Sequence, residues 1–523
     1  MRQLFSLLIL GVVLLVPDGR AQQPNEAPGS PLPSKTAETL TAEGPEAGTL
    51  YLTTERFRLK EGGFSQVERG HLFVPMDRSD PESPTISVEV YRFPATTEAG
   101  AERPPIFRLF GGPGFEGLTA DELDESDFYS EFIAPLREIA DVVVVGQRGI
   151  GLSRPHTRCE GPPSMAPDRL LTTEDVKARR QNASRACKQF WSERGLALDG
   201  LNVLEAAADV NAVREALGYD NVILRGQSFG SHWSMAVMRE YPDIVERAVL
   251  SGLEGPNATY DMPSGLLNSL ERAAADAEQD EALAPHIPED GLIAAFETVV
   301  ERLRDAPATA TVEHPKTGDS VEVRIGPRDR SDLADGYGSV PDSLHDMAGW
   351  PRDVLALHDG DYEEAAKDKA EDRTGPPGFP TAGFFMLDCA SGITPEREKE
   401  LDNDPAVDLI GKPGAEAYQH ACPVWDVDLG DDFRTGFEID VPTVMVHGTW
   451  DLSTPLMNAE RLQPAFTNGT LVPVKRGTHG AFWEARDASD AFAEGIDHFL
   501  RTGDRSQVPD TVTLPKVDWI VPQ

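Results

Sequence analysis

The most informative segment of this 523-residue chain is Asn221-Val222-Ile223-Leu224-Arg225-Gly226-Gln227-Ser228-Phe229-Gly230. Its apolar run predicts a buried strand, and the residues after it, as far as Tyr241-Pro242, have the pattern of a helix. A serine between glycines on a tight strand-to-helix turn is held in a strained backbone conformation, with its hydroxyl clear of the sheet edge. The segment therefore predicts that Ser228 is a nucleophile.

Two later segments predict the partners that a nucleophilic serine needs. Residues 441–448 are typical of a buried parallel strand, and Asp451 lies in the turn directly after them. Residues 470–474 predict another strand, which leads into His479 and then a terminal helix. The order nucleophile, acid, base is that of a hydrolytic triad. We expect Asp451 to orient the imidazole and His479 to be the general base.

Each residue of this triad also has a structural alternative. A serine between glycines is often only part of a turn, Asp451 could cap a helix, and His479 could be a loop histidine bonded to backbone. All three residues in the right order and at strand ends favour the catalytic interpretation. His232 lies one helical turn after Ser228 and His447 lies inside a strand, so we expect both histidines to be structural.

A glycine-rich loop predicts where an oxyanion would be stabilised. Residues 104–110 form an apolar run that leads directly into Gly111-Gly112-Pro113-Gly114. Glycines leave backbone N–H groups uncovered, so we assign the donors to the N–H groups of Gly112 and of Phe229, the residue after the nucleophile. The alternative is a simple Gly/Pro turn between a strand and a helix.

These features resemble the α/β-hydrolase peptidases that include the prolyl aminopeptidases and tripeptidyl aminopeptidases. Besides the glycine-rich loop and the Ser228 turn, the similar parts are Gln147-Arg148-Gly149-Ile150-Gly151-Leu152-Ser153, the helix predicted over 205–218 with Asp209 and Arg214, and residues 448–455. Together they span about residues 53–500. The resemblance implies a triad of Ser228, Asp451 and His479, and release of residues from the amino end of peptides.

Two positions depart from that family. It usually has His ahead of the Gly-Gly-Pro-Gly loop, where this chain has Phe110, and Asp ahead of Gln-Arg-Gly, where this chain has Gly146. Neither position belongs to the triad, so catalysis should survive both changes. Side chains near the oxyanion loop shape the entrance, however, so the departures leave the exact substrate open.

The alternation of strand and helix patterns predicts an α/β-hydrolase fold, with a mostly parallel sheet flanked by helices and an inserted, mainly helical cap. After residue 255 the pattern changes to amphipathic helices, such as 266–277 and 292–303. We therefore divide the folded part into a first core segment over 50–255, a cap or lid over 256–440 and a second core segment over 441–523. A cap over the serine would favour small peptides and exclude folded proteins.

The first residues are expected to direct export. Met1-Arg2 is a short positive start, residues 4–16 are an apolar run too short to span a bilayer, and Gly19-Arg20-Ala21 offers small residues for cleavage. Residues 1–21 thus predict a signal peptide and a secreted or periplasmic protein without a stable membrane anchor, with an uncleaved anchor as the alternative. Residues 22–49 contain few large apolar side chains and are expected to be a disordered linker.

The cysteines fit an oxidising compartment, since their number is even and the chain is predicted to be exported. The four cysteines allow three pairings. We favour Cys159 with Cys187 and Cys389 with Cys422, because each pair closes a short loop. The chain has neither a C-x-x-C nor an H-E-x-x-H spacing, so we expect no catalytic metal and no cofactor.

The charge of the chain bears on its partners. The formal net charge is -40, from 88 acidic and 48 basic residues, so nucleic acid phosphates would be repelled. An exopeptidase must also recognise the α-ammonium group of its substrate, for which a partly buried carboxylate is suited. Glu254, just after the strand that ends at Ser251, is the best-placed candidate and Asp261 the second. The alternative is that both carboxylates simply face water.

The sequence therefore predicts an exported serine aminopeptidase that acts on small peptides through an acyl-enzyme on Ser228. It would release one N-terminal residue, such as proline, or a tripeptide. A carboxylesterase could use the same triad, and a non-catalytic binding protein on the same fold is the alternative from a different class. The oligomeric state is left open by the sequence.

Overall fold

A ten-stranded sheet runs through the computed structural model of the protein, which describes residues 45–115, 117–118, 123, 127–328, 343–374, 380–412 and 414–522. The strand order is β1-β2-β3-β5-β4-β6-β7-β10-β11-β12. Three antiparallel strands begin it: β1 (Leu50–Arg58), β2 (Phe64–Pro75) and β3 (Thr85–Phe93). The predicted signal peptide, residues 1–21, and residues 22–44 of the predicted linker lie outside the described residues.

The remaining strands are parallel to one another, and β3 joins them through an antiparallel pairing with β5. They are β4 (Ile106–Leu109), β5 (Val142–Val145), β6 (Val222–Ser228), β7 (Val245–Leu253), β10 (Thr443–Gly448), β11 (Gly469–Lys475) and β12 (Val512–Thr513). Every residue of β4, β5 and β10 is buried, as expected for parallel strands covered on both faces. The predicted α/β-hydrolase fold is confirmed.

Helices cover both faces of the sheet, and successive strand residues point to opposite sides. Phe107 and Leu224 pack with α6 (Val203–Leu217) and α7 (Phe229–Glu240), whereas their neighbours Ile106 and Ile223 belong to the core on the other face. That second core includes residues of α3 (Asp127–Phe132), α4 (Ala134–Arg137), α18 (Ala481–Ala488) and α19 (Asp490–Thr502). Two short helices, α1 (Glu98–Ala101) and α17 (Leu456–Leu462), complete this part of the chain.

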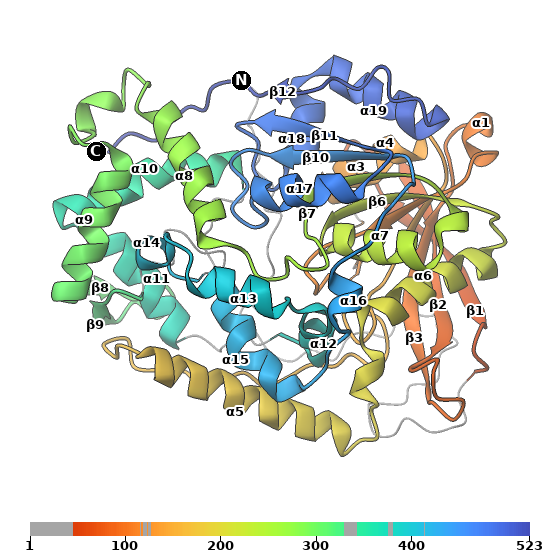
Figure 1. The fold of residues 1–523 in the computed structure, drawn as a ribbon, viewed down its shortest axis with the longest axis horizontal. Helices are drawn as coiled ribbons and strands as arrows, with labels where there is room; N and C mark the ends of the chain where they lie inside the picture. The colour runs from red at the N-terminus through yellow and green to blue at the C-terminus, as the bar shows by residue number, and fades with distance from the viewer. Residues whose placement is uncertain are drawn as a thin grey trace.

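The segment between β7 and β10 is mostly helical, and Figure 1 shows α8 to α11 gathered on the side of the molecule away from β1–β3. Its helices are α8 (Pro263–Ala277), α9 (Leu292–Asp305), α10 (Leu344–Asp359), α11 (Glu363–Thr374), α12 (Ala382–Ser391), α13 (Pro395–Asp402), α14 (Val407–Ile410), α15 (Ala415–Trp425) and α16 (Asp431–Arg434). A two-stranded hairpin, β8 (Ala308–Glu313) and β9 (Ser320–Ile325), also belongs to it and was not expected from the sequence.

A helix from the first half of the chain packs against this segment. The long helix α5 (Thr173–Ser192) runs along α15 (Figure 1), and the Lys188 ammonium group donates hydrogen bonds to the carbonyl oxygens of Val424 and Trp425, at 3.1 and 2.7 Å. Two disulfides, in the favoured pairing, hold this region. Cys159–Cys187 ties α5 to the loop before it, and Cys389–Cys422 joins α12 to α15. No helix within the described ranges is both long and apolar enough to cross a membrane.

Candidate active site

Ser228 lies where β6 ends and α7 begins, in the turn that the sequence predicts. Its backbone has φ 57° and ψ -133°, in the left-handed region that non-glycine residues rarely adopt. The flanking glycines permit this turn. A Cβ on Gly226 would lie 2.3 Å from the carbonyl oxygen of Gly230, and one on Gly230 would lie 2.1 Å from that of Leu109. The half-buried serine is thus presented at the carboxyl end of the sheet.

Asp451 and His479 are hydrogen-bonded to each other. His479 Nδ1 lies 3.0 and 3.1 Å from the two carboxylate oxygens of Asp451. Asp451 also accepts hydrogen bonds from the backbone N–H groups of Ser453 and Thr454, at 3.0 and 2.8 Å, and from the Thr454 hydroxyl at 3.0 Å. Burial alone would raise the pKa of Asp451, but His479, His447 and the backbone N–H of Thr454 outweigh it and hold the pKa below its ordinary value. Asp451 does not cap α17, whose N-cap is Pro455, but its hydrogen bonds to the turn before that helix fix the carboxylate beside His479.

The imidazole ring of His479 lies beside the Ser228 turn. A Cβ on Gly252 would lie 2.8 Å from His479 Cε1, so the ring rests directly on β7 at that glycine. The next residue, Leu253, is the register partner of Ser228. In addition, the Gln227 side chain donates a hydrogen bond to the carbonyl oxygen of His479 at 3.4 Å. The structure therefore brings the three predicted triad residues to the same edge of the sheet.

The glycine-rich loop touches the serine from the other side. A Cβ on Gly111 would lie 2.6 Å from Ser228 Cβ and 3.1 Å from Ser228 Oγ. Gln147 holds both ends of this loop. Its amide nitrogen donates to the carbonyl oxygens of Phe110 and Gly111, at 3.2 and 3.0 Å, and its oxygen accepts from the N–H of Gly114 at 2.7 Å. Gln147 begins the Gln-Arg-Gly motif described above, but the motif alone indicates no role for this side chain.

Two buried carboxyl groups, Glu254 and Asp388, and a half-buried one, Asp261, lie near the triad. Glu254 follows the end of β7 and its backbone N–H donates to the Ser231 hydroxyl, one helical turn after Ser228. Asp388 on α12 accepts a hydrogen bond from the Tyr418 hydroxyl at 2.5 Å, and Asp261 accepts one from the Asn458 amide at 2.6 Å. Within the described part of the chain, Oε1 of Glu254 and Oδ1 of Asp388 are buried without a hydrogen-bond partner.

These carboxyl groups resist ionisation. Burial raises the pKa of Glu254 well above its ordinary value, and the neighbouring Asp388 and Asp261 carboxylates raise it further. Burial also raises the pKa of Asp388 to about 8 and that of Asp261 to about 7. Glu254 was predicted as a site residue and Asp261 was its alternative. Asp388 was missed, although a single charged residue in the otherwise apolar stretch 384–390 was a signal for it.

An aromatic stack connects the glycine-rich loop with these carboxyl groups. The rings of Phe384 and Tyr418 are stacked with centroids 6.2 Å apart, and Tyr418 stacks on Tyr260 at 5.3 Å. A Cβ on Gly114 would lie 3.7 Å from the Phe384 ring. Since Tyr418 also binds Asp388, the stack forms an apolar wall that ends at a carboxyl group.

The two other histidines have structural contacts, as predicted. His447 is buried, accepts a hydrogen bond from the N–H of Leu253 at 3.1 Å and donates to the carbonyl oxygen of Thr454 at 2.6 Å. His232 lies 2.8 Å from the Ser391 hydroxyl and packs between two aromatic rings. No cluster of three metal-ligating side chains occurs in the described ranges.

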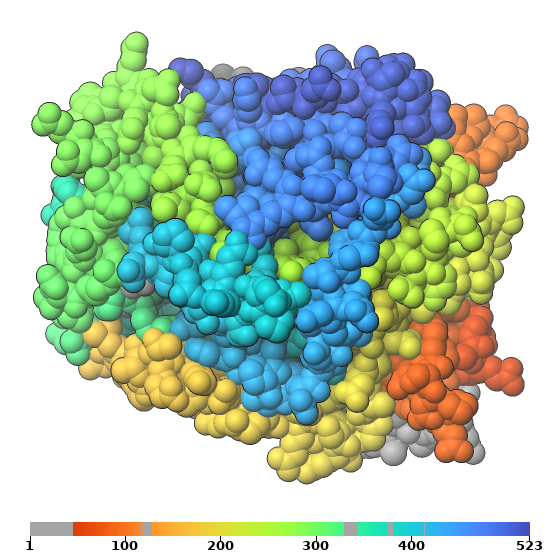
Figure 2. Space-filling model, in the orientation of Figure 1, coloured from red at the N-terminus to blue at the C-terminus, as the bar shows by residue number. Residues whose placement is uncertain are grey.

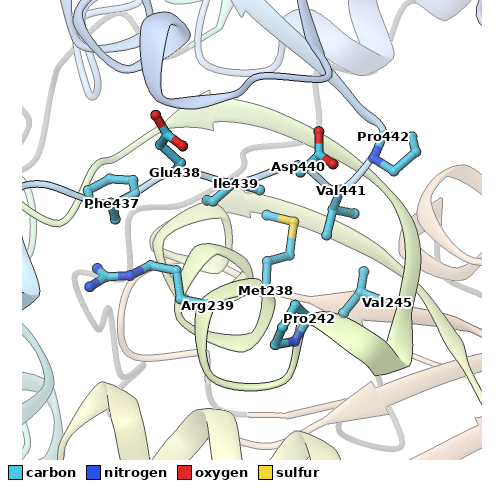
Figure 3. A pocket seen from close by; sticks show the side chains of 10 residues that line it. All are labelled: Met238, Arg239, Pro242, Val245, Phe437, Glu438, Ile439, Asp440, Val441 and Pro442. Atoms are coloured by element: carbon cyan, nitrogen blue, oxygen red, sulfur yellow. The ribbon is translucent and has the colours of Figure 1, made fainter.

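Two pockets are lined by residues other than the three triad candidates. A pocket of about 540 Å³ is lined by Val245 and Pro442, at the amino ends of β7 and β10, so it opens at the opposite edge of the sheet (Figure 3). A second pocket of about 360 Å³ lies between residues 255–258, α13 and α17, and includes Asn458, the partner of Asp261. Figure 2 shows this hollow between the cyan atoms of α13 and the blue atoms of α17.

A Ser-Asp-His arrangement at the carboxyl edge of a mostly parallel sheet defines the chain as a serine hydrolase of the α/β-hydrolase fold. Comparison with known proteins agrees: a family model for the alpha/beta hydrolase fold matches residues 104–284, and one for TAP-like proteins matches residues 407–513. The two matches and the relatives below support an α/β-hydrolase serine peptidase.

Among its relatives is the serine protease Hip1 of Mycobacterium tuberculosis, 24% identical over 419 residues, which are 74% of this chain and 76% of that protein. The tripeptidyl aminopeptidase of Streptomyces coelicolor is 27% identical over 196 residues, 36% of each chain. Among solved structures, a laboratory-evolved potato epoxide hydrolase is 14% identical with a TM-score of 0.35, and the match covers 82% of this chain and all of that one.

Proposed function

We propose that this serine peptidase is an exported aminopeptidase that releases an N-terminal residue or a tripeptide from small peptides. Ser228 attacks the scissile carbonyl carbon while His479 takes the hydroxyl proton and passes it to the leaving amine. Asp451 keeps the imidazole in the tautomer that this transfer needs. Water, activated by His479, then hydrolyses the acyl-enzyme on Ser228, and neither step needs a cofactor.

The oxyanion of each tetrahedral intermediate would be bound by the backbone N–H groups of Gly112 and Phe229. Such donors act only if they are held in place before the reaction begins. The hydrogen bonds from Gln147 to both ends of the glycine-rich loop support this preorganisation.

The observation that favours an aminopeptidase is the pair of buried carboxyl oxygens without partners, Glu254 Oε1 and Asp388 Oδ1. Neighbouring buried carboxyl groups cannot both ionise at little cost, and a substrate ammonium group would supply both the opposite charge and the missing donors. A peptide held by its free amino group would place its first bonds near Ser228. The wall formed by Phe384, Tyr418 and Tyr260 would then contact the first side chains.

Export is the second part of the proposal. It rests on the signal-peptide pattern of residues 1–21, and the two disulfides are compatible with an oxidising compartment. Cleavage after Ala21 would be detected by amino-terminal sequencing of the protein from a culture medium or periplasmic fraction. Recovery of the full-length chain in the cytoplasm would contradict it.

The catalytic proposal is tested with a matched substrate panel: a proline arylamide, a tripeptide arylamide, their N-blocked forms and a short-chain ester. We expect turnover of the free-amine amides, loss of turnover on blocking and no turnover by Ser228→Ala. Turnover of the ester alone would indicate a carboxylesterase. No turnover of any substrate, together with no labelling of Ser228 by an organophosphonate, would favour a binding protein.

Substitutions of the carboxyl groups test the recognition of the substrate amine. Glu254→Gln and Asp388→Asn should raise KM for free-amine substrates by about tenfold or more, because a charge-assisted hydrogen bond contributes about 2 kcal/mol. Labelling of Ser228 by an uncharged organophosphonate should change little. The control is Glu297→Gln, which removes an exposed carboxylate from α9. Equal losses with blocked and free-amine substrates would contradict the assignment.

A further inference from the structure

Two fully buried arginines lie side by side beneath the candidate site. Arg108 on β4 and Arg225 on β6 are 1% and 0% exposed. They are direct register partners of two parallel strands, so their side chains leave the same face of the sheet. Arginine is rarely buried unless it is paired with an acid, so two adjacent ones need an explanation.

Neither arginine has an acidic partner. Arg108 donates to the carbonyl oxygen of Leu109 at 3.1 Å and to the Gln227 side chain at 3.0 Å, and Arg225 donates to the carbonyl oxygen of Gly226 at 2.5 Å and to the Ser251 hydroxyl at 3.0 Å. Among the described residues no carboxylate forms an ion pair with either one, and both Nε–H groups are buried without a partner.

Aromatic rings take the place of counter-ions. The Arg108 guanidinium lies 4.2 Å from the ring centroid of Phe110, and that of Arg225 lies 3.9 Å from the ring centroid of Phe482. A cation over an aromatic face is stabilised by the ring quadrupole without being neutralised. This arrangement also accounts for Phe110, which stands where the resembling family usually has His, because a second basic group there would repel Arg108.

Burial opposes the positive charge of both guanidinium groups. Burial lowers the pKa of Arg108 to about 9, which still leaves it protonated at pH 7. Burial, together with the positive charges of Arg108 and Arg486, lowers the pKa of Arg225 well below its ordinary value. A guanidinium group resists deprotonation more than any other side chain, and the hydrogen bonds from Arg225 to a carbonyl and a hydroxyl oxygen favour its charged form.

The pair is close to the reacting groups. Arg225 precedes Ser228 by three residues on the same strand, a distance of about 10 Å along the backbone. Arg108 is connected to the candidate base, because it binds the Gln227 side chain, which in turn binds the carbonyl oxygen of His479. Two uncompensated positive charges therefore lie below the turn where negative charge would develop.

Most titratable groups around His479 are acids, so nearby positive charges would counteract them. Its charged and titratable neighbours are Asp451 and His447 from the β10 end, Asp261 after β7 and Glu484 on α18. Glu254 and Asp388 add acidic groups nearby. The ionised Asp451 favours the protonated form of His479, which cannot act as a base, and each of the other acids adds to this effect and opposes the formation of an oxyanion when it ionises. Acidic groups that bind an ammonium group would thus disfavour the catalytic steps at the neighbouring Ser228 and His479.

We propose that Arg108 and Arg225 form a buried cationic pair that offsets these carboxylates, favours the neutral form of His479 and stabilises the oxyanion on the acylated Ser228. They are positioning residues, since neither touches the reacting atoms. The inference rests on the triad role proposed above, but not on the choice between peptides and esters.

The test compares the pH profiles of kcat/KM for Arg108→Met and Arg225→Met with that of the wild type. The acidic limb of each profile reports the apparent pKa of His479. Removing a positive charge about 10 Å away, in a medium of effective dielectric about 20, should raise that apparent pKa by about one unit and lower the plateau kcat about tenfold. Arg225→Lys should retain the wild-type profile. The control is Arg92→Met on β3, whose guanidinium is paired with Glu68 at 3.0 Å and with Asp141 at 3.2 Å, at the opposite edge of the sheet, and which should leave the limb unmoved.

The pH dependence of Ser228 labelling by an organophosphonate gives the same readout without a peptide substrate. It therefore separates failure of this inference from failure of the aminopeptidase proposal. Arg108→Gln and Arg225→Gln keep hydrogen-bond donors and serve where the methionine variants do not fold. An unshifted acidic limb in folded, less active variants would overturn the proposal. So would a failure of all neutral variants to fold, since the role of the pair would then be structural.

Discussion

Thr454 is a residue whose importance lies in one hydroxyl group. It donates to Asp451 at 3.0 Å and lies 3.3 Å from His479 Nδ1. Thr454→Val keeps the shape and removes this donor, so the carboxylate should hold the imidazole less firmly. We expect kcat to fall about tenfold or more, since a hydrogen bond to a charged group contributes about 2 kcal/mol, with little change in KM. Steady-state kinetics on a free-amine arylamide measures this effect.

The matched variant is Thr454→Ser, which restores the hydroxyl and should recover most of kcat. A valine variant with wild-type kcat would show that the backbone N–H groups of Ser453 and Thr454 are sufficient to fix Asp451.

At the scale of elements, the parallel strands and the strand ends that carry the three triad candidates could be predicted because each is encoded locally. β5 is the run Val142 to Val145, and Ser228 lies in a motif that is complete within ten residues. The helix α5 and the hairpin β8–β9 were missed for physical reasons. α5 buries only Ala183, Ser184, Cys187 and Trp191, so it has no strong apolar stripe, and its clearest local signal was the capping box of Thr172 with Asp175.

The groups proposed to bind the substrate amine illustrate the same limit. Glu254 could be suggested because it directly follows a predicted strand, but Asp388 and Tyr418 lie on two helices of the segment between β7 and β10. They meet only when those helices pack, and no local motif specifies that contact. The sequence patterns assigned no role to Gln147 or Arg108, because their contacts depend on which loop and which strand pack opposite them.

The pair of helices α12 and α15 leads to a prediction about their disulfide. Cys389 is adjacent to Asp388, and Cys422 is one turn after Tyr418, so Cys389–Cys422 holds the two groups together. Replacing both cysteines by alanine should lower the free energy of unfolding by about 4 kcal/mol, the entropic contribution expected for a loop closed over a separation of 33 residues. KM for free-amine substrates should also rise, as measured by kinetics and thermal unfolding.

The equivalent double substitution at Cys159 and Cys187 is the control, because that disulfide lies on α5 and its preceding loop. It should lower stability without a comparable rise in KM. Equal effects on KM from both pairs would indicate that the whole region loosens together.

At the scale of the whole molecule, buried acids make stability depend on pH. Asp388 has a pKa of about 8 in the folded protein, above its unfolded value, because it is buried. Such a group contributes stability that is fully present below the unfolded pKa and is lost as pH rises through about 8. Asp388→Asn should therefore gain stability relative to the wild type as pH rises from about 5 to 8, by at most roughly 1 kcal/mol per pH unit.

Thermal unfolding of both proteins across that pH range measures this difference. A free-amine ligand should reduce the difference in stability between the two proteins, since its ammonium group would compensate the ionised carboxyl group of the wild type. A constant difference between the two proteins would show that Asp388 does not titrate in this range.

The Cys389–Cys422 bond also affects when the protein can act. If the chain is exported as we propose, it is made in a reducing cytoplasm, where this bond would be open and Asp388 and Tyr418 would be less firmly joined. The newly synthesised chain would hold peptide amino groups poorly, and full competence would follow oxidation outside. The cell's own cytoplasmic peptides would thus be spared by the redox state of the compartment, without a separate inhibitor or propeptide.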